Sequence, residues 1–413
     1  MKINVNPVKG MRDFLPAEVR LREYVKRKIS ETYEQQGFSL IETPAVENIE
    51  LLTNSEGGDN LQLIFKILKR GEQLQLGRAD LSEDSIVDCG LRYDLTLPLS
   101  RFYANNKEKL PSPFKSMQIG AVYRAERPQK GRYRSFTQCD IDIIGEASPL
   151  AECELINATA KALQSVEMQN FTIKISDRRI LTAVIAGFGF AQEVAPTICL
   201  ALDKADKIGW DGVLQELCEN GLPVDKVQEF IRAVRGLSLD ALESYGVPAS
   251  ISAPLTEVIA LVSGLAAGQY QVLFTPTLVR GMGYYTGMVF EVATEGLGLA
   301  VAGGGRYDAM IGKWIGTMVP AVGFSIGFER IILLLQERGF VPPSSSARLA
   351  LLFSYEQDSY ESILLTAEKL RAAGHQVNTL PVRNKLGKQL AQLEAEGYGG
   401  YYSLAKGELI LFP

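Results

Sequence analysis

The chain has 413 residues, a formal net charge of −5 and a hydrophobic content of 46%. This length allows two or three domains with sizeable cores, and the negative charge excludes binding to nucleic acid through a basic overall field. The five cysteines lack paired spacing, and no uninterrupted apolar run approaches the length of a membrane span. We therefore expect a cytoplasmic protein with no membrane partner.

His375 is the only histidine in the chain. Its position between an expected helix and an expected strand favours a surface or packing role. This count excludes histidine triads and two-histidine zinc sites, and it excludes a histidine general base unless His375 itself serves. A P-loop is also excluded, because no G-x-x-x-x-G-K-[ST] motif occurs. The chemistry must therefore rely on Arg, Asp, Glu, Gln and Tyr side chains.

The expected elements begin with an amphipathic helix after Pro16 and a short strand that Pro44 stops. The segment 91–96 predicts a further strand, on which Asp94 and Thr96 point the same way. Strand follows strand without long intervening helices. This order indicates an antiparallel sheet of the α+β class rather than a doubly wound parallel sheet.

The segment from Tyr123 to Gly145 joins a basic loop to a strand with two distinct faces. The loop carries five cations, Arg124, Arg127, Lys130, Arg132 and Arg134. On the strand, one face carries Phe136, Gln138, Asp140 and Asp142, and the other carries Thr137, Cys139, Ile141 and Ile143. Guanidinium groups bind phosphate oxygens through a planar fork. The pattern therefore predicts a polyphosphate site beside a polar cleft floor; the alternative is a solvated loop before an ordinary half-exposed strand.

From residue 176 to 268 apolar residues recur at helical spacing, which predicts an inserted helical domain. A β-rich pattern then resumes and ends in a helix expected at 323–336. A Pro-Pro-Ser-Ser-Ser run at 342–346 predicts a linker, and the remainder alternates as β-α-β-α-β. The expected domains are a core at 1–175, the insertion at 176–268, the continued core at 269–338 and an α/β domain at 347–413.

The loop and strand from Tyr123 to Gly145 resemble motif 2 of class II aminoacyl-tRNA synthetases. Their amino-acid sequence resembles that of the histidyl-tRNA synthetase family in particular. Further stretches similar to that family follow in its order, at 9–13, 91–96, 278–285, 302–308 and 323–330. The resemblance implies a class II antiparallel sheet flanked by helices, with a helical insertion and a shortened anticodon-binding-like domain. Because 38–44 resembles the motif that builds the dimer interface, it also implies a homodimer.

The resemblance implies an ATP site in which arginines hold the phosphates. Arg124 and Arg280 are expected at the α-phosphate as the catalytic residues, and Mg²⁺ is expected to accompany ATP. The other implied ATP contacts are Glu126 near the adenine or metal, Arg132 and Arg330 at the outer phosphates, and Phe136 stacked on adenine. Arg330 could instead be an ordinary helix-surface arginine. Gly283 stands where the family commonly has Asp, so a carboxylate orienting Arg280 is in doubt.

The resemblance also implies a histidine site. The expected ammonium ligands are Asp94, Thr96 and Gln138. Asp142 and Tyr285 are expected to bind the imidazole. Tyr307 is expected as another wall of the pocket, and Tyr284 is a further expected residue of the histidine site. A carboxylate and a phenol can together read the two nitrogens of an imidazole. The tyrosine pair could alternatively be strand core.

We therefore expect an enzyme that activates histidine with ATP and transfers it to tRNA(His). One alternative is a catalytically silent paralogue that acts as the regulatory subunit of ATP phosphoribosyltransferase in histidine biosynthesis, and another is adenylation without tRNA charging. In the C-terminal domain, Arg383, Lys385 and Lys388 are the expected tRNA phosphate contacts, or else a solvated helix start.

Overall fold

The computed structural model describes residues 3–53, 58–74, 82–129, 131–279, 284–294, 300–343 and 348–412. The chain divides into two compact units. The larger comprises Met1–Asp13 and Arg22–Arg338, and the smaller comprises Phe14–Leu21 and Gly339–Pro413. Each unit has its own sheet and its own buried side chains.

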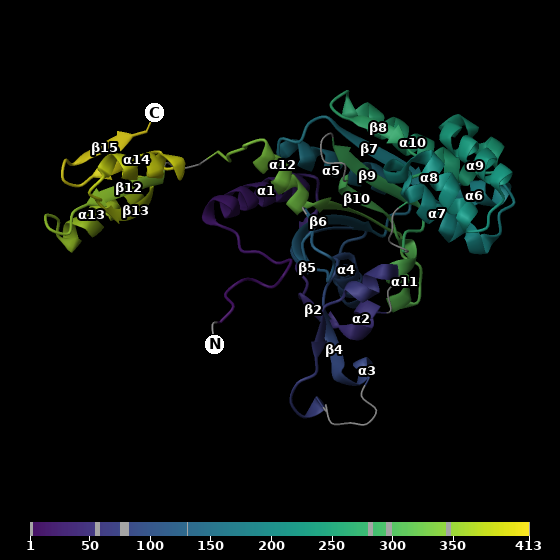
Figure 1. The fold of residues 1–413 in the computed structure, drawn as a ribbon, viewed down its shortest axis with the longest axis horizontal. Coiled ribbons are helices and arrows are strands. Elements are labelled where there is room, and N and C mark those ends of the chain that lie inside the picture. The colour runs from purple at the N-terminus through teal and green to yellow at the C-terminus, as the bar shows by residue number, and fades with distance from the viewer. Residues whose placement is uncertain are drawn as a thin grey trace. The chain divides into compact units, whose positions relative to one another are not determined.

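An eight-stranded sheet forms the centre of the larger unit, in the order β1-β5-β6-β11-β10-β9-β7-β8 (Figure 1). In that order its strands are Ser39–Leu40, Phe114–Tyr123, Ser135–Ile144, Ala321–Gly327, Ala300–Arg306, Met288–Thr294, Phe171–Asp177 and Gln271–Phe274. The inner strands are antiparallel to one another, whereas edge strands β1 and β8 pair in parallel with β5 and β7. The predicted α+β architecture with an antiparallel sheet is confirmed, with two parallel edge pairs that the sequence did not indicate.

The two faces of β6 differ as its alternating sequence predicts. Cys139, Ile141 and Ile143 are fully buried on one face. Helices α1 (Pro16–Gln35), α5 (Leu150–Ser165) and α12 (Phe328–Glu337) cover this side of the sheet (Figure 1). The opposite face, which carries Gln138 and Asp142, is left for a polar site.

The helix expected at 323–336 begins later than predicted. Ala321–Gly327 forms strand β11, which is hydrogen-bonded to β6 on one side and β10 on the other. The helix α12 therefore starts only at Phe328. The helix prediction was wrong for the first residues of this apolar run, because strand pairing inside a sheet overrides local helical periodicity.

A smaller three-stranded antiparallel sheet, which we call the arm, projects from the larger unit (Figure 1). Its strands in order are β2 (Val46–Asn48), β4 (Val87–Leu91) and β3 (Lys66–Leu68). The short helices around it and beside the main sheet are α2 (Ile49–Thr53), η1 (Gly58–Leu63), η2 (Gly71–Gln73), α3 (Glu83–Ile86), α4 (Thr96–Asn106), η3 (Lys107–Lys109) and α11 (Asp308–Ile315).

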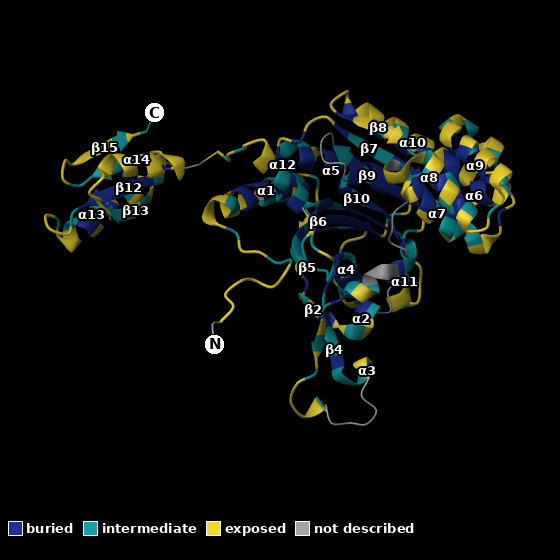
Figure 2. Ribbon diagram, viewed as in Figure 1, coloured by how far each residue is buried: buried dark blue, intermediate teal, exposed yellow. Residues whose placement is uncertain are grey.

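A group of helices separates strands β7 and β8. They are α6 (Arg178–Gly187), η4 (Gln192–Val194), α7 (Ala195–Asp203), α8 (Ala205–Glu219), α9 (Val224–Gly236), η5 (Leu239–Tyr245) and α10 (Ala249–Ala266). Because β7 and β8 are parallel, a long crossover must join them, and these helices supply it. Figure 2 shows that they are buried on one side and exposed on the other.

Helix α10 qualifies the expectation that no apolar segment reaches membrane-spanning length. Ala249–Ala266 is long and apolar enough to cross a bilayer by length and composition. However, it contains Pro254, and its buried residues, including Leu255, Val258 and Val262, lie on the side that contacts α5, β7 and β8. Helix α10 is therefore a packing helix of the larger unit.

The smaller unit is a four-stranded sheet in the order β13-β12-β14-β15. Its elements along the chain are β12 (Arg348–Phe353), α13 (Tyr360–Ala372), β13 (Gln376–Pro381), α14 (Leu386–Ala395), β14 (Gly400–Ser403) and β15 (Glu408–Leu411). Alternate residues of β12 pack on opposite sides, with Ile363 of α13 on one side and Leu393 of α14 on the other. The structure has one strand more than the expected β-α-β-α-β order, because β14 and β15 form a hairpin at the end of the unit.

Candidate active site

A cavity of about 430 Å³ lies against the polar face of β6. The sequence-predicted site residues that line it are Asp94, Thr96, Arg124, Glu126, Arg132, Phe136, Gln138, Asp142, Tyr284, Tyr285, Tyr307 and Arg330. Arg280 and Gly283 lie outside the described residues. Residues from distant parts of the chain therefore meet at one polar cavity.

Small residues on β11 keep the floor of the cavity open. Gly323, Ser325 and Gly327 lie directly opposite Asp142, Asp140 and Gln138 of β6. A Cβ atom on Gly323 would lie 2.1 Å from Oδ1 of Asp142, closer than any van der Waals contact allows. Glycine is therefore required there if the carboxylate is to keep its place.

Three buried carboxylates gather at this floor: Asp94, Asp140 and Asp142 are 2%, 4% and 3% exposed. Burial raises the pKa of Asp94 to about 6 and that of Asp142 to about 7. Burial, and next the neighbouring charge of Asp142, raise the pKa of Asp140. Asp140 belongs to the predicted polar face, but no sequence pattern assigns it a role.

Two polar atoms in the cavity lack a partner. Oδ2 of Asp94 and Oε1 of Gln138 are buried and have no hydrogen-bond partner within the described part of the chain. Both are acceptors, and leaving buried acceptors unsatisfied is costly. A ligand that brings donors, such as an ammonium group, would satisfy them.

Asp94 and Thr96 reach the cavity differently from the prediction. Strand β4 ends at Leu91, Asp94 lies in the loop that follows, and Thr96 is the first residue of α4. Oδ1 of Asp94 accepts a hydrogen bond of 3.2 Å from the backbone N–H of Leu97, as a helix-capping side chain does. The strand prediction was wrong for these two residues. The sequence did contain a signal for a helix start here: Asp94 is followed closely by Pro98, and proline is tolerated in the first turn of a helix.

Tyrosines form the wall beside Asp142. The hydroxyl of Tyr307 donates a hydrogen bond of 2.6 Å to Oδ1 of Asp142. The ring of Tyr284 lies 4.8 Å from that of Tyr285 and 6.1 Å from that of Tyr307, centre to centre. Gly305 lies beneath Tyr285, since a Cβ there would approach its ring to 2.8 Å.

Cationic side chains line the other end of the β6 floor. The guanidinium of Arg124 lies 5.2 Å from the centre of the Phe136 ring, and its Nε donates to the carbonyl of Tyr93. Arg132 pairs with Glu126 at 2.9 Å. Nη1 of Arg330 donates to the carbonyl of Ala300. Phe136 and Asp142 are six residues apart on one strand, about 20 Å at ~3.3 Å per residue, so the site has separate cationic and acidic ends.

Glu329 and Arg22 also belong to this region, and sequence reasoning missed both. Glu329 lines the cavity, accepts bonds of 2.5 and 2.8 Å from Arg22, and accepts one of 3.1 Å from the N–H of Thr137. These bonds tie α1 and α12 to the start of β6. The pair is 307 residues apart in sequence, so no local pattern could have revealed it.

Comparison with known proteins gives consistent matches. A family model described as histidyl-tRNA synthetase matches residues 10–331. A histidine-tRNA ligase of Leifsonia xyli subsp. xyli is 42% identical over 414 residues, covering 96% of this chain and 94% of that protein. The crystal structure of histidyl-tRNA synthetase from Nostoc sp. PCC 7120 superposes with a TM-score of 0.80 at 27% identity, covering 100% of this chain and 97% of that one.

One further solved structure bears on the alternative function. It is described as an ATP phosphoribosyltransferase regulatory subunit/histidyl-tRNA synthetase from Bacillus halodurans C. It superposes with a TM-score of 0.76 at 21% identity and covers 98% of both chains. At this level of identity the likeness is one of fold alone.

Proposed function

The chain belongs to the histidyl-tRNA synthetase family, and from this premise we propose that it activates histidine with ATP and transfers the histidyl group to tRNA(His). It is an enzyme of the class II aminoacyl-tRNA synthetases, and its substrates are histidine, ATP and tRNA. The observation that carries the proposal is that an acidic, tyrosine-walled end and a cationic end belong to one cavity.

In the first step, a carboxylate oxygen of histidine attacks the α-phosphorus of ATP. A new P–O bond forms, the bond to pyrophosphate breaks, and histidyl-adenylate results. In the second step, a hydroxyl of the terminal ribose of tRNA attacks the activated carbonyl carbon, and AMP leaves. Negative charge on the phosphate oxygens increases in the first step. Catalysis of this step therefore depends mainly on fixed cations at the α-phosphate, which stabilise the transition state.

The acidic end is proposed to bind the amino acid. The unpartnered acceptors on Asp94 and Gln138 suit the ammonium group, with Thr96 beside them. Asp142, held by Tyr307, suits an imidazole N–H, while Tyr285 reads the other nitrogen. Tyr284 packs against both tyrosines and supports them.

The cationic end is proposed to bind ATP. Phe136 offers a ring for adenine, and Arg124 beside it suits the α-phosphate. Arg132 and Arg330 suit the outer phosphates, and the arginine of the 278–285 motif, Arg280, is proposed as the second α-phosphate cation on the basis of resemblance alone. Its role stays a prediction.

Mg²⁺ is proposed on the chemistry of ATP. Among the described residues, no group of three His, Cys, Asp or Glu side chains could hold a metal ion by itself. Mg²⁺ commonly binds through one or two carboxylates together with substrate phosphates. Glu126, which lines the cavity beside Arg132, is the carboxylate best suited to that part.

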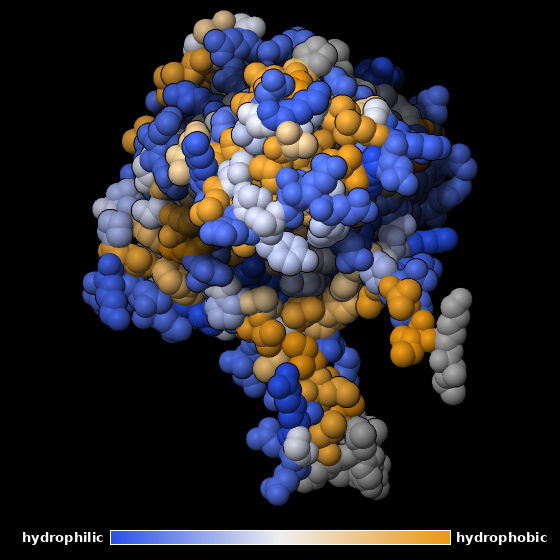
Figure 3. All heavy atoms as spheres, turned by 90° about the vertical axis from the view of Figure 1, so that its left-hand side faces the viewer, coloured by the Kyte–Doolittle hydropathy of each residue, from blue (hydrophilic) through white to orange (hydrophobic). Residues whose placement is uncertain are grey.

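We also propose a homodimer. Strand β1 belongs to the segment 38–44 that resembles the dimer-interface motif, and it ends at Leu40, which is 59% exposed. Figure 3 shows hydrophobic side chains gathered along the arm, where Val46 and Leu68 are 45% and 48% exposed. Exposed apolar groups of this kind favour a protein contact.

A cytoplasmic location remains part of the proposal, supported by five free cysteines.

The regulatory-subunit alternative is not favoured. The curated relatives that match nearly the whole chain at 34–42% identity are named histidine-tRNA ligases, whereas the structure described with a regulatory subunit shares only the fold.

The deciding experiment is histidine-dependent ATP–pyrophosphate exchange, followed by charging of tRNA(His). We expect both activities. Absence of exchange would contradict the proposal, and exchange without charging would indicate adenylation alone. The Arg280→Ala variant should lose about 3 kcal/mol of transition-state stabilisation, roughly a hundredfold in rate, with histidine binding retained.

A further inference from the structure

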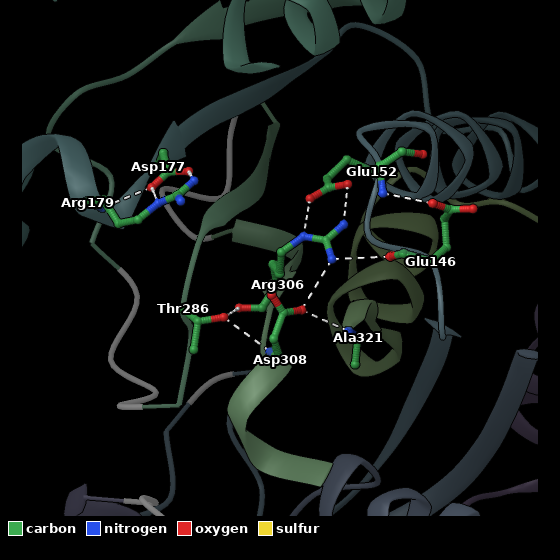
Figure 4. Close-up of polar contacts among 9 residues, drawn as sticks. Glu146, Glu152, Asp177, Arg179, Thr286, Arg306, Asp308 and Ala321 are labelled. Carbon is green, nitrogen blue, oxygen red and sulfur yellow. Dashed lines mark hydrogen bonds and ion pairs between the residues drawn. The ribbon is translucent and has the colours of Figure 1, made fainter. Parts of the chain in front are cut away.

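A buried ion-pair cluster surrounds Arg306, the residue that precedes Tyr307 in the chain (Figure 4). Arg306 donates from Nε and Nη2 to both carboxylate oxygens of Glu152, at 2.6 and 2.7 Å. Its Nη1 donates to Oδ1 of Asp308 at 3.2 Å and to the carbonyl of Glu146 at 3.3 Å. The Arg306 and Glu152 side chains are 10% and 2% exposed, so the pair is shielded from solvent.

The cluster joins backbone segments that carry the tyrosines. Thr286, which follows Tyr285, donates its N–H to the carbonyl of Arg306 at 2.8 Å, and its Oγ1 accepts from the N–H of Asp308 at 3.1 Å. Oδ1 of Asp308 also accepts from the N–H of Ala321 at 2.9 Å (Figure 4). Tyr307 lies between Arg306 and Asp308, so both neighbours of this tyrosine are fixed.

Arg306 and Tyr307 are adjacent in the chain, and their side chains make contacts on opposite sides of the backbone. The Tyr307 hydroxyl reaches Asp142 inside the cavity, while the Arg306 side chain reaches Glu152 on α5. A shift of the Arg306 backbone would therefore move Tyr307 directly and Tyr285 through Thr286.

We propose that Arg306, Glu152 and Asp308 form a positioning cluster for the histidine pocket. The cluster holds Tyr285 and Tyr307 in place beside Asp142, and in this way it sets the affinity for the imidazole of histidine. None of the three acidic or basic groups lines the cavity. They act through the tyrosines, and the inference rests on the proposed function of that pocket. A buried bidentate pair suits this task, since its planar geometry fixes both partners.

The test measures KM for histidine and for ATP separately in pyrophosphate exchange, with Arg306→Lys and Glu152→Gln in the full chain. A lysine keeps the charge but loses the fork that grips both oxygens. We expect KM for histidine to rise by about tenfold or more, with KM for ATP within about twofold, because a misplacement near 1 Å can cost that much. The double variant should lose little more than either single variant, as expected of one unit.

Arg179→Lys is the matched control. Arg179 makes a similar bidentate pair with Asp177, but that pair joins residues only two positions apart in the chain (Figure 4). It should leave both KM values unchanged. Thermal unfolding of each variant separates a misplaced pocket from a damaged fold; if Arg306→Lys does not fold, the isosteric Glu152→Gln decides the question.

Equal changes in both KM values, or an unchanged KM for histidine in a folded variant, would overturn the positioning role. A wild-type protein without exchange activity would instead contradict the proposed function. In that case calorimetric titration with histidine still tests the cluster, because weaker binding by the variants supports it and equal binding overturns it.

Discussion

The hydroxyl of Tyr307 donates a 2.6 Å hydrogen bond to Oδ1 of Asp142, although the two residues are 165 positions apart in the chain. The bond orients a buried carboxylate whose burial raises its pKa to about 7. A carboxylate of that kind is poised to accept a hydrogen bond from a ligand and is costly to leave without one. The following predictions depend on this arrangement and on the residues around it.

Asp142→Asn should weaken histidine binding and leave ATP binding nearly unchanged. The amide keeps an acceptor for Tyr307 but loses the charge, and a hydrogen bond to a charged group contributes about 1.5 to 3 kcal/mol. Calorimetric titration with each ligand measures the effect, and Tyr307→Phe, which removes only the orienting bond, should give a smaller loss. Equal losses for histidine and ATP would indicate general damage to the cavity.

The same substitution should change how stability depends on pH. The pKa of Asp142 is about 7 in the folded protein and about 3.9 in an unfolded chain, so the folded state binds the proton more tightly. This group therefore favours folding most at low pH, and the contribution is lost as pH rises toward 7. Relative to wild type, Asp142→Asn should gain stability between pH 5 and pH 8, on the order of 2 kcal/mol.

Urea unfolding followed by tryptophan fluorescence checks this, because both tryptophans, Trp210 and Trp314, lie in the larger unit. A difference between the two proteins that stays constant with pH would contradict the expected shift.

Gly323→Ala should impair histidine use while the protein still folds. The added methyl group would meet Oδ1 of Asp142, the end of a side chain that can move away, rather than backbone. We expect KM for histidine to rise by about tenfold or more, since the displaced carboxylate no longer faces its ligand. Gly264→Ala is the control, because it has open space around it. Equal kinetics for the two variants would show that the carboxylate position is unimportant.

Replacing Arg383, Lys385 and Lys388 together by Ala should raise KM for tRNA without affecting pyrophosphate exchange. All three are exposed at or just before the start of α14 in the smaller unit, and none of them is among the residues that line the cavity. If they contact phosphates, the variant should also show a shallower dependence of tRNA binding on salt. Unchanged KM and unchanged salt dependence would identify them as a solvated helix start.

The sequence by itself determined the polar floor of the site. Alternation from Phe136 to Asp142 predicts one buried and one polar face, because side chains of any strand point to opposite sides in turn. The buried state of Cys139 and Ile141 follows that prediction, as does the lining of the cavity by Gln138 and Asp142. The arginines of the preceding loop could also be predicted, because they are neighbours in sequence.

Only the tertiary structure decided which groups complete that floor. Tyr307 reaches Asp142, Arg22 reaches Glu329 and Arg306 reaches Glu152 through contacts between distant segments. Gly323 is a strand residue because β11 pairs on both sides, although its surroundings in sequence read as a helix. Sheet register and helix packing set these partners, and they depend on the whole chain rather than on local propensity, so a periodic pattern identifies a face without identifying what meets it.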